Sequence, residues 1–103
     1  MYRAAFSFTK KGIIRFTSHL DLLRMFGRAF RRADLPLKMT EGFNPHPKFS
    51  IKRAIKLGVE SEGEEAEVIL REPVNEACFT VKLQEQLPQG ITLKEVKIKF
   101  LPT

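Results

Sequence analysis

The chain has no tryptophan and a single cysteine, Cys78, and both scarcities limit what it can be. One cysteine forms no internal disulfide and provides no cluster of thiolates for zinc or an iron–sulfur centre. We therefore expect no resident cofactor, and we expect Cys78 to be a small buried side chain within an apolar helical pattern. With nine phenylalanines and no tryptophan, the predicted core is built on phenylalanine.

Long apolar runs and the signature motifs of several enzyme classes are also missing. No stretch approaches the roughly 20 apolar residues of a transmembrane helix, and residues 2–9 alternate in polarity, unlike a secretory signal. No phosphate-binding loop, nucleophile elbow or dinucleotide-binding motif is present. The sequence thus predicts a cytoplasmic domain that has no membrane partner.

Acidic residues are rare in the first part of the chain. Residues 1–58 hold 13 Lys/Arg against 3 Asp/Glu, a charge of +10, whereas residues 59–103 hold 5 against 9, a charge of −4, and the two sum to +6. A basic pole of this kind favours a polyanion, with nucleic acid ahead of an anionic membrane because no stretch pairs the charge with a wide apolar face. The alternative is a basic face that serves only solubility.

The 103 residues predict one small domain, 1–103, with a two-layer core. The spacing of apolar residues predicts a strand at 2–9, a turn at 10–12, a short extended piece at 13–16 and a helix from 19 to a stop at 34–36. Strands are predicted next at 37–40, 49–57 and 65–71. A helix at 76–87 and a strand at 91–100 with a bulge at 94–95 complete the chain. Because 37–40 and 49–57 form one interrupted strand, the order predicts a ferredoxin-like βαββαβ sandwich. This is an α+β fold in which two helices cover one face of a four-stranded antiparallel sheet.

The first predicted helix carries the arginines. Thr17 or Ser18 is its expected N-cap, and Ser18 with Asp21 resembles a capping box. Gly27 weakens the helix by about 1 kcal/mol relative to alanine, which is tolerable where another backbone packs closely. We expect nucleic acid to contact this helix and neighbouring lysines, with Tyr2 or Phe43 offering an aromatic face. The predicted nucleic-acid-binding side chains are Arg24, Arg28, Arg31, Arg32, Lys48, Lys52 and Lys56.

The loop between the two halves of the interrupted strand is rigid and polar. It consists of Gly42, Phe43, Asn44, Pro45, His46, Pro47 and Lys48. The two prolines fix their own φ and hold Asn44 and His46 away from the α region, so the His46 side chain hangs from a backbone with little freedom.

If this loop folds over the start of the arginine helix, His46 meets His19 and Asp21 there. Metal-free phosphodiester cleavage needs a histidine acid or base and cationic groups near the phosphate, so these three residues are the candidate catalytic set. The same three groups lack the tight spacing of a metal site, and no metal is predicted. Each also has a structural alternative, because His19 is equally a partly buried side chain bonded to a carbonyl, and Asp21 a first-turn acid facing the helix dipole.

Two motifs give the chain a family likeness. The runs SHLDLLRMFGRAFRRADLPLKMTEGFNPHPKFS and LGVESEGEEAEVIL resemble the radical-SAM-linked protein family, a small domain of unknown function fused to or encoded beside radical S-adenosylmethionine proteins. The resemblance covers nearly the whole chain and implies a bacterial cytoplasmic domain with a radical SAM protein as partner. This chain lacks the three-cysteine motif of the radical SAM module, so it does not carry that cofactor itself.

Three functions follow as hypotheses. The first is a non-catalytic accessory module that binds RNA or a ribonucleoprotein surface through its basic face. The second is a metal-independent phosphodiesterase or ribonuclease that uses His46 and His19. The third is a protein-docking domain for the radical SAM partner.

Overall fold

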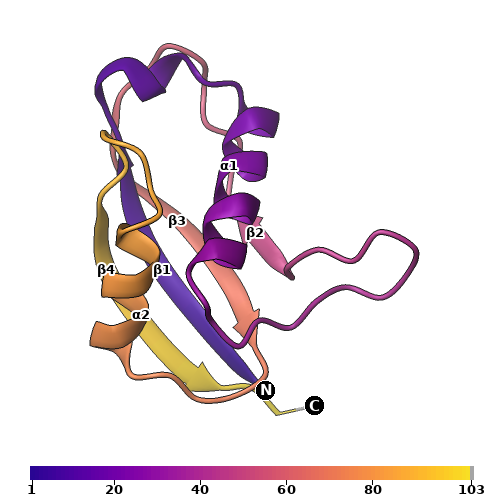
Figure 1. Ribbon diagram of the computed structural model, residues 1–103. Helices are drawn as coiled ribbons and strands as arrows, with labels where there is room; N and C mark the ends of the chain where they lie inside the picture. The colour runs from indigo at the N-terminus through magenta and orange to yellow at the C-terminus, as the bar shows by residue number, and fades with distance from the viewer. Residues whose placement is uncertain (103) are drawn as a thin grey trace.

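The computed structural model describes residues 1–102. Its elements are β1 (Tyr2–Lys10), a 3-10 helix η1 (Gly12–Phe16), α1 (His19–Arg32), β2 (Phe49–Ile51), β3 (Ser61–Leu70), α2 (Glu76–Gln84) and β4 (Leu93–Phe100). The four strands form one antiparallel sheet in the order β2-β3-β1-β4 (Figure 1). This arrangement confirms the predicted ferredoxin-like α+β fold.

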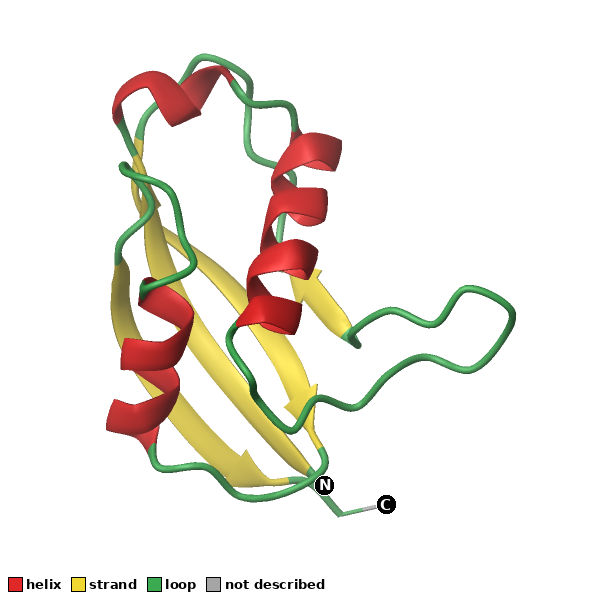
Figure 2. Ribbon diagram, viewed as in Figure 1, coloured by secondary structure: helices red, strands yellow, loops and turns green. Residues whose placement is uncertain are grey.

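Phenylalanine rings join the helices to the sheet. Phe26 of α1 lies 4.9 Å from Phe8 and 6.0 Å from Phe6 between ring centroids, and Phe79 of α2 lies 6.0 Å from that same Phe6 ring. Both helices therefore pack on one face of the sheet, as Figure 2 shows, and the predicted phenylalanine core is confirmed. The other face is open.

The start of α1 is fixed by its cap and by a buried lysine. The Ser18 hydroxyl accepts the backbone N–H of Asp21 at 3.1 Å, as predicted. Lys10, predicted to lie in a turn, ends β1 with no exposed surface, and its Nζ donates to the Thr17 carbonyl at 2.8 Å. Burial lowers the pKa of Lys10, and nearby Glu64 opposes that shift. The entry into α1 is therefore tied to the sheet.

The predicted strand 49–57 ends early, at Ile51, and a buried carboxylate, that of Glu64, binds the chain just beyond that end. Arg53 interrupts the apolar alternation because its guanidinium makes two 2.9 Å hydrogen bonds to Glu64, which is only 2% exposed. The hydrogen bonds from Arg53 are the main cause that lowers the pKa of the Glu64 carboxyl, and the Ser61 hydroxyl adds to them. The regular strand stops at Ile51, although the Lys52 N–H still bonds the Glu65 carbonyl at 2.8 Å.

Other local predictions differ from the structure. Residues 13–16 are helical, within η1, because Gly12 at φ 67° turns the chain at their start. Residues 37–40 make only two isolated bridges, Leu37 to Leu70 and Met39 to Pro47. Helix α2 ends at Gln84, and β3 begins at Ser61. Cys78 is exposed, because Phe79 and Leu83 are the α2 residues that face the core. The bulge at 94–95 is confirmed by the shift from the Phe6–Val96 pair to the Phe8–Leu93 pair.

Candidate nucleic-acid interface

Residues 38–48, here called the arm, form an irregular hairpin between α1 and β2. The Thr40 N–H donates to the His46 carbonyl at 2.8 Å, and the His46 N–H donates to the Thr40 hydroxyl at 3.1 Å. The base of the arm joins the sheet, since the Ile69 N–H donates to the Lys48 carbonyl at 2.9 Å. Figure 1 shows the arm projecting away from the sheet beside α1. The predicted loop between the two segments is therefore present, although 37–40 makes only isolated bridges and is not a strand.

The tip of the arm, residues 41–45, is fully on the surface. Gly42 has φ 121°, a conformation that only glycine adopts easily, so it makes the turn. The next residue, Phe43, is 104% exposed. An aromatic ring at the end of a projecting hairpin contacts nothing within the domain and is available to another molecule.

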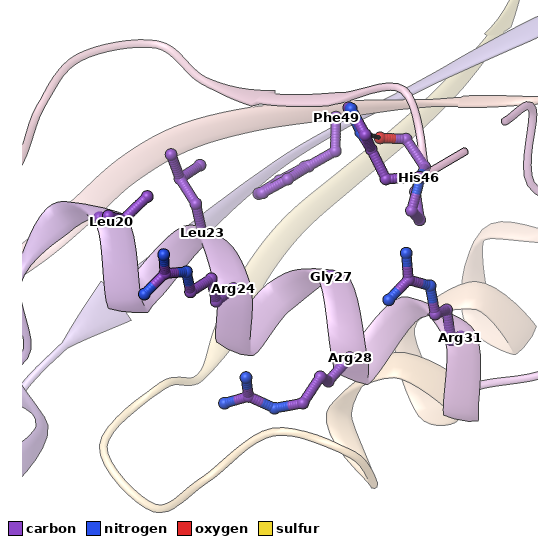
Figure 3. Close-up of a pocket in the computed structure, with 9 residues that line it drawn as sticks. Leu20, Leu23, Arg24, Gly27, Arg28, Arg31, His46 and Phe49 are labelled. Carbon is purple, nitrogen blue, oxygen red and sulfur yellow. Dashed lines mark hydrogen bonds between the residues drawn. The ribbon is translucent and has the colours of Figure 1, made fainter. Parts of the chain in front are cut away.

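A groove of about 470 Å³ separates the arm from α1. One wall is helical and basic, the other comes from the arm and β2, and the floor is apolar. Its lining residues are Leu20, Leu23, Arg24, Gly27, Arg28, Arg31, His46, Pro47 and Phe49. In Figure 3, Arg31 and His46 point toward one another across the groove, and Phe49 reaches from β2 toward the helix.

Nearby carboxylates balance little of the positive charge that the arginines bring to the groove. Arg24 lies 3.5 Å from the Asp21 carboxylate, with both side chains mostly exposed, so the pairing is weak. Arg31 donates to the Pro45 carbonyl at 3.4 Å, which leaves its charge unneutralised. Within residues 1–102, neither Arg28 nor Arg31 has a carboxylate oxygen within 4.0 Å of its guanidinium.

Four basic residues in or beside the sheet pair with acids from the second half of the chain. Strand β3 supplies the acids, and it lies between β1 and β2 in the sheet. The pairs are Arg3–Glu67, Lys11–Glu62, Lys52–Glu65 and Arg53–Glu64. The +10 of residues 1–58 is therefore not one basic pole, and the unpaired part of it includes the arginines of α1.

His46 is the best-positioned of the candidate catalytic residues. Its backbone is held by Thr40 on both the N–H and the carbonyl, and Pro45 and Pro47 restrict it further. Its ring Nδ1 lies 3.3 Å from the Pro47 carbonyl oxygen. A carbonyl only accepts, so in this contact Nδ1 carries the hydrogen and leaves Nε2 free for another partner.

The structure does not bring His19 and Asp21 to His46, and the predicted meeting of the three is wrong. The arm contacts α1 at Arg31, and His19 lies twelve residues earlier, about 18 Å along the helix axis. Neither residue lines the groove. His19 is half-buried, and among residues 1–102 its buried Nδ1 has no hydrogen-bond partner, so the structure does not show the carbonyl bond considered for it. Within residues 1–102 no three His, Cys, Asp or Glu side chains are grouped to hold a metal ion.

The remaining predicted contact residues are spread over the surface. Arg32 is exposed on the last turn of α1 but outside the groove. Lys48 borders a depression with Glu67, and Lys52 is paired with Glu65 at 3.1 Å. Lys56 is exposed in the loop after β2, and Asn44 lies at the arm tip.

Sequence reasoning missed the floor of the groove. Leu23 and Phe49 fit patterns typical of a core and Pro47 belongs to the predicted loop, and their meeting on the floor of one groove depends on the arm being held beside α1. Tyr2 packs edge-on against Phe100 at 5.6 Å and does not line the groove. Gly27 did give a signal, since a glycine inside a helix is costly, but the close backbone expected to explain it is absent: a Cβ there would meet nothing within 4 Å.

No helix within residues 1–102 is long and apolar enough to cross a membrane.

Comparisons with other proteins identify the family of this chain. Comparison with curated proteins and with solved structures returns no match. A family model described as "Uncharacterized protein conserved in bacteria (DUF2344)" matches residues 3–100, and the chain belongs to that family.

Proposed function

We propose that this domain is a non-catalytic accessory module that binds RNA in the cytoplasm through the groove between α1 and the arm. The observation that carries the proposal is the contrast in charge pairing. Arg3, Lys52 and Arg53, in or beside the sheet, are matched by carboxylates of β3, whereas Arg28 and Arg31 line the groove without one within residues 1–102. Lys97 and Lys99 of β4 also lack one there, but they lie outside the groove.

The composition of the groove suits RNA better than other polyanions. Guanidinium groups bind phosphate oxygens in a two-pronged fashion, and unpaired bases stack on aromatic rings. Phe49 at the floor and Phe43 at the arm tip supply such rings beside the arginines. The open face of the sheet mixes Glu65, Glu67 and Glu95 with cations such as Lys52 and Lys97, so its charge favours a polyanion less than the groove does.

Catalysis is the less favoured candidate. A ribonuclease without metal needs two proton-transfer groups at one phosphate. His46 is the only one of the two histidines in the groove, and His19 lies about 18 Å along α1 from the arm contact. Cleavage of RNA by the wild-type protein that disappears in His46→Ala, with binding retained, would replace the accessory role by this one.

The test compares two variants of equal net charge. Arg28→Ala with Arg31→Ala removes two groove cations, and Lys97→Ala with Lys99→Ala removes two exposed cations of β4. Binding of a labelled single-stranded RNA is measured by fluorescence anisotropy over a range of salt concentrations. Each lost phosphate contact lowers the slope of log K against log salt by about 0.7, so the groove variant should lose up to about 1.4 and the β4 variant almost nothing.

Equal losses in the two variants would mean that only net charge matters, and the groove would have no special role. RNA affinity in the wild type that does not fall with added salt would also contradict the proposal. Circular dichroism on both variants checks that the fold is intact, which is expected because all four side chains are exposed.

A second candidate role is docking to a radical SAM protein, which rests on the resemblance of the SHLDLLR and GFNPHPK motifs. An exposed apolar cluster supports it: Ile13 and Phe16 of η1 are 85% and 58% exposed, and Leu57 and Val59 of the adjoining loop are 60% and 49% exposed. The Gly58 N–H donates to the Arg15 carbonyl at 2.7 Å, which holds the two segments together. Copurification with the radical SAM protein after nuclease treatment, lost in Phe16→Ser with Leu57→Ser, would establish docking; complete loss on nuclease treatment would refute it.

A further inference from the structure

Gly27 lowers the stability of α1, and the fold itself does not require a glycine at this position. It sits in the middle of the helix, where glycine is less favourable than alanine, and it has no positive φ that would demand glycine. A Cβ built on it meets no atom within 4 Å, so no neighbouring element needs the space. Folding alone would therefore select alanine at this position.

The space beside Gly27 is the groove. Gly27 lines it at the helix wall, one turn from Leu23 on one side and from Arg31 on the other. Phe49 approaches from β2, with its ring 5.3 Å from Phe26 and 4.9 Å from Phe30 on the core side, so the ring is held in place (Figure 3). The missing side chain thus leaves room between a fixed aromatic ring and a bare stretch of helix.

The groups around this gap differ in kind. Its floor is apolar, with Leu23, Pro47 and Phe49, and its rim carries guanidinium groups and the His46 ring. A lone phosphate would not use the apolar floor, and an apolar peptide would not use the unpaired cations. A nucleotide uses both, because it joins a flat base to a phosphate. Bases inside a duplex are stacked and paired, so only an unpaired base can enter.

Building on the proposed RNA binding, we infer that the groove over Gly27 receives one unpaired nucleotide. Its base lies between Phe49 and the helix backbone at Gly27, and its phosphates meet Arg28 and Arg31. His46 Nε2, left free by the contact of Nδ1 with the Pro47 carbonyl, faces the same nucleotide. The ligand class of the domain is therefore single-stranded RNA.

The substitution Gly27→Ala tests this inference, because it separates stability from binding. Alanine fits the helix and removes the cost of glycine, so the melting temperature should rise by roughly 4–8 °C. The same methyl group projects from the helix wall into the space assigned to the base, so affinity for a single-stranded oligoribonucleotide should fall by about tenfold or more. Gly63→Ala on β3 is the matched control, since its Cβ also meets nothing within 4 Å and it lies outside the groove.

Three probes keep the inference distinct from the proposed function: the single strand, its duplex, and the single strand carrying abasic sites. The wild type should prefer the intact single strand, and Gly27→Ala should bind all three about equally. Unchanged single-strand affinity in Gly27→Ala, or equal wild-type affinity for intact and abasic strands, would overturn base insertion while leaving backbone binding standing. No RNA binding by the wild type would overturn the proposed function, and this inference with it.

Discussion

The hydrogen bond between Thr40 and His46 gives a direct test of whether the arm is rigid. The His46 N–H donates to the Thr40 hydroxyl at 3.1 Å, and the neighbouring backbone bond from Thr40 N–H to the His46 carbonyl is 2.8 Å. Thr40→Val keeps the shape of the side chain and removes only the hydroxyl acceptor. A hydrogen bond of this kind contributes about 1 kcal/mol, so opening of the arm should become roughly five times more frequent.

Amide hydrogen exchange followed by NMR measures this opening at His46. We expect exchange of the His46 amide to accelerate about fivefold in Thr40→Val, with the exchange of β1 amides unchanged because the arm lies outside the core. Thr80→Val is a suitable control, since its hydroxyl donates to the Glu76 carbonyl within α2. A His46 amide that exchanges at the same rate in wild type and Thr40→Val would refute the view that this bond holds the arm.

Two further predictions concern stability. Phe26→Ala removes a fully buried ring of α1 that packs against the sheet. The free energy of unfolding in urea should therefore fall by about 3–5 kcal/mol. A loss below about 1 kcal/mol would show that the core does not depend on this ring. Glu64 has its pKa lowered chiefly by the Arg53 hydrogen bonds. Its contribution to stability is thus present above the unfolded pKa of about 4.3 and disappears as the pH falls through the lower folded pKa. In Glu64→Gln the urea midpoint should change less with pH across this acidic window, and an identical pH profile in both proteins would contradict the assignment.

The fold could be predicted from sequence because most elements are amphipathic in a simple way. In α1 the buried residues Leu22, Phe26 and Phe30 fall at helical spacing, and the Ser18 cap marks its start. The failures occur where tertiary contacts override local pattern. Lys10 reads as a turn residue, yet it is buried because a carbonyl at the entry to α1 is within its reach. Arg53 interrupts an apolar alternation, yet its guanidinium pairs with the buried carboxylate of Glu64, eleven residues later.

The candidate site was predicted only in part, for a geometric reason. Rigidity of the loop around His46 follows from its two prolines, but the end of α1 that it meets depends on where β2 enters the sheet. The arm reaches the C-terminal half of the helix, at Arg31, and not the start, where His19 lies. No local pattern in the sequence indicates which end of α1 the arm contacts.

The distribution of charge follows from strand order in the same way. The acid-rich β3 is central, so its outward carboxylates reach cations on both neighbours, Arg3 of β1 and Lys52 after β2. Helix α1 lies on the opposite face, out of reach of those carboxylates, and within residues 1–102 its Arg28 and Arg31 have no carboxylate oxygen within 4.0 Å. If the arginines of α1 served only solubility, there would be no reason for the helix to carry Gly27 beside them at a cost of about 1 kcal/mol. The unpaired charge and the missing side chain occur in one groove, and a ligand that is both anionic and flat accounts for both.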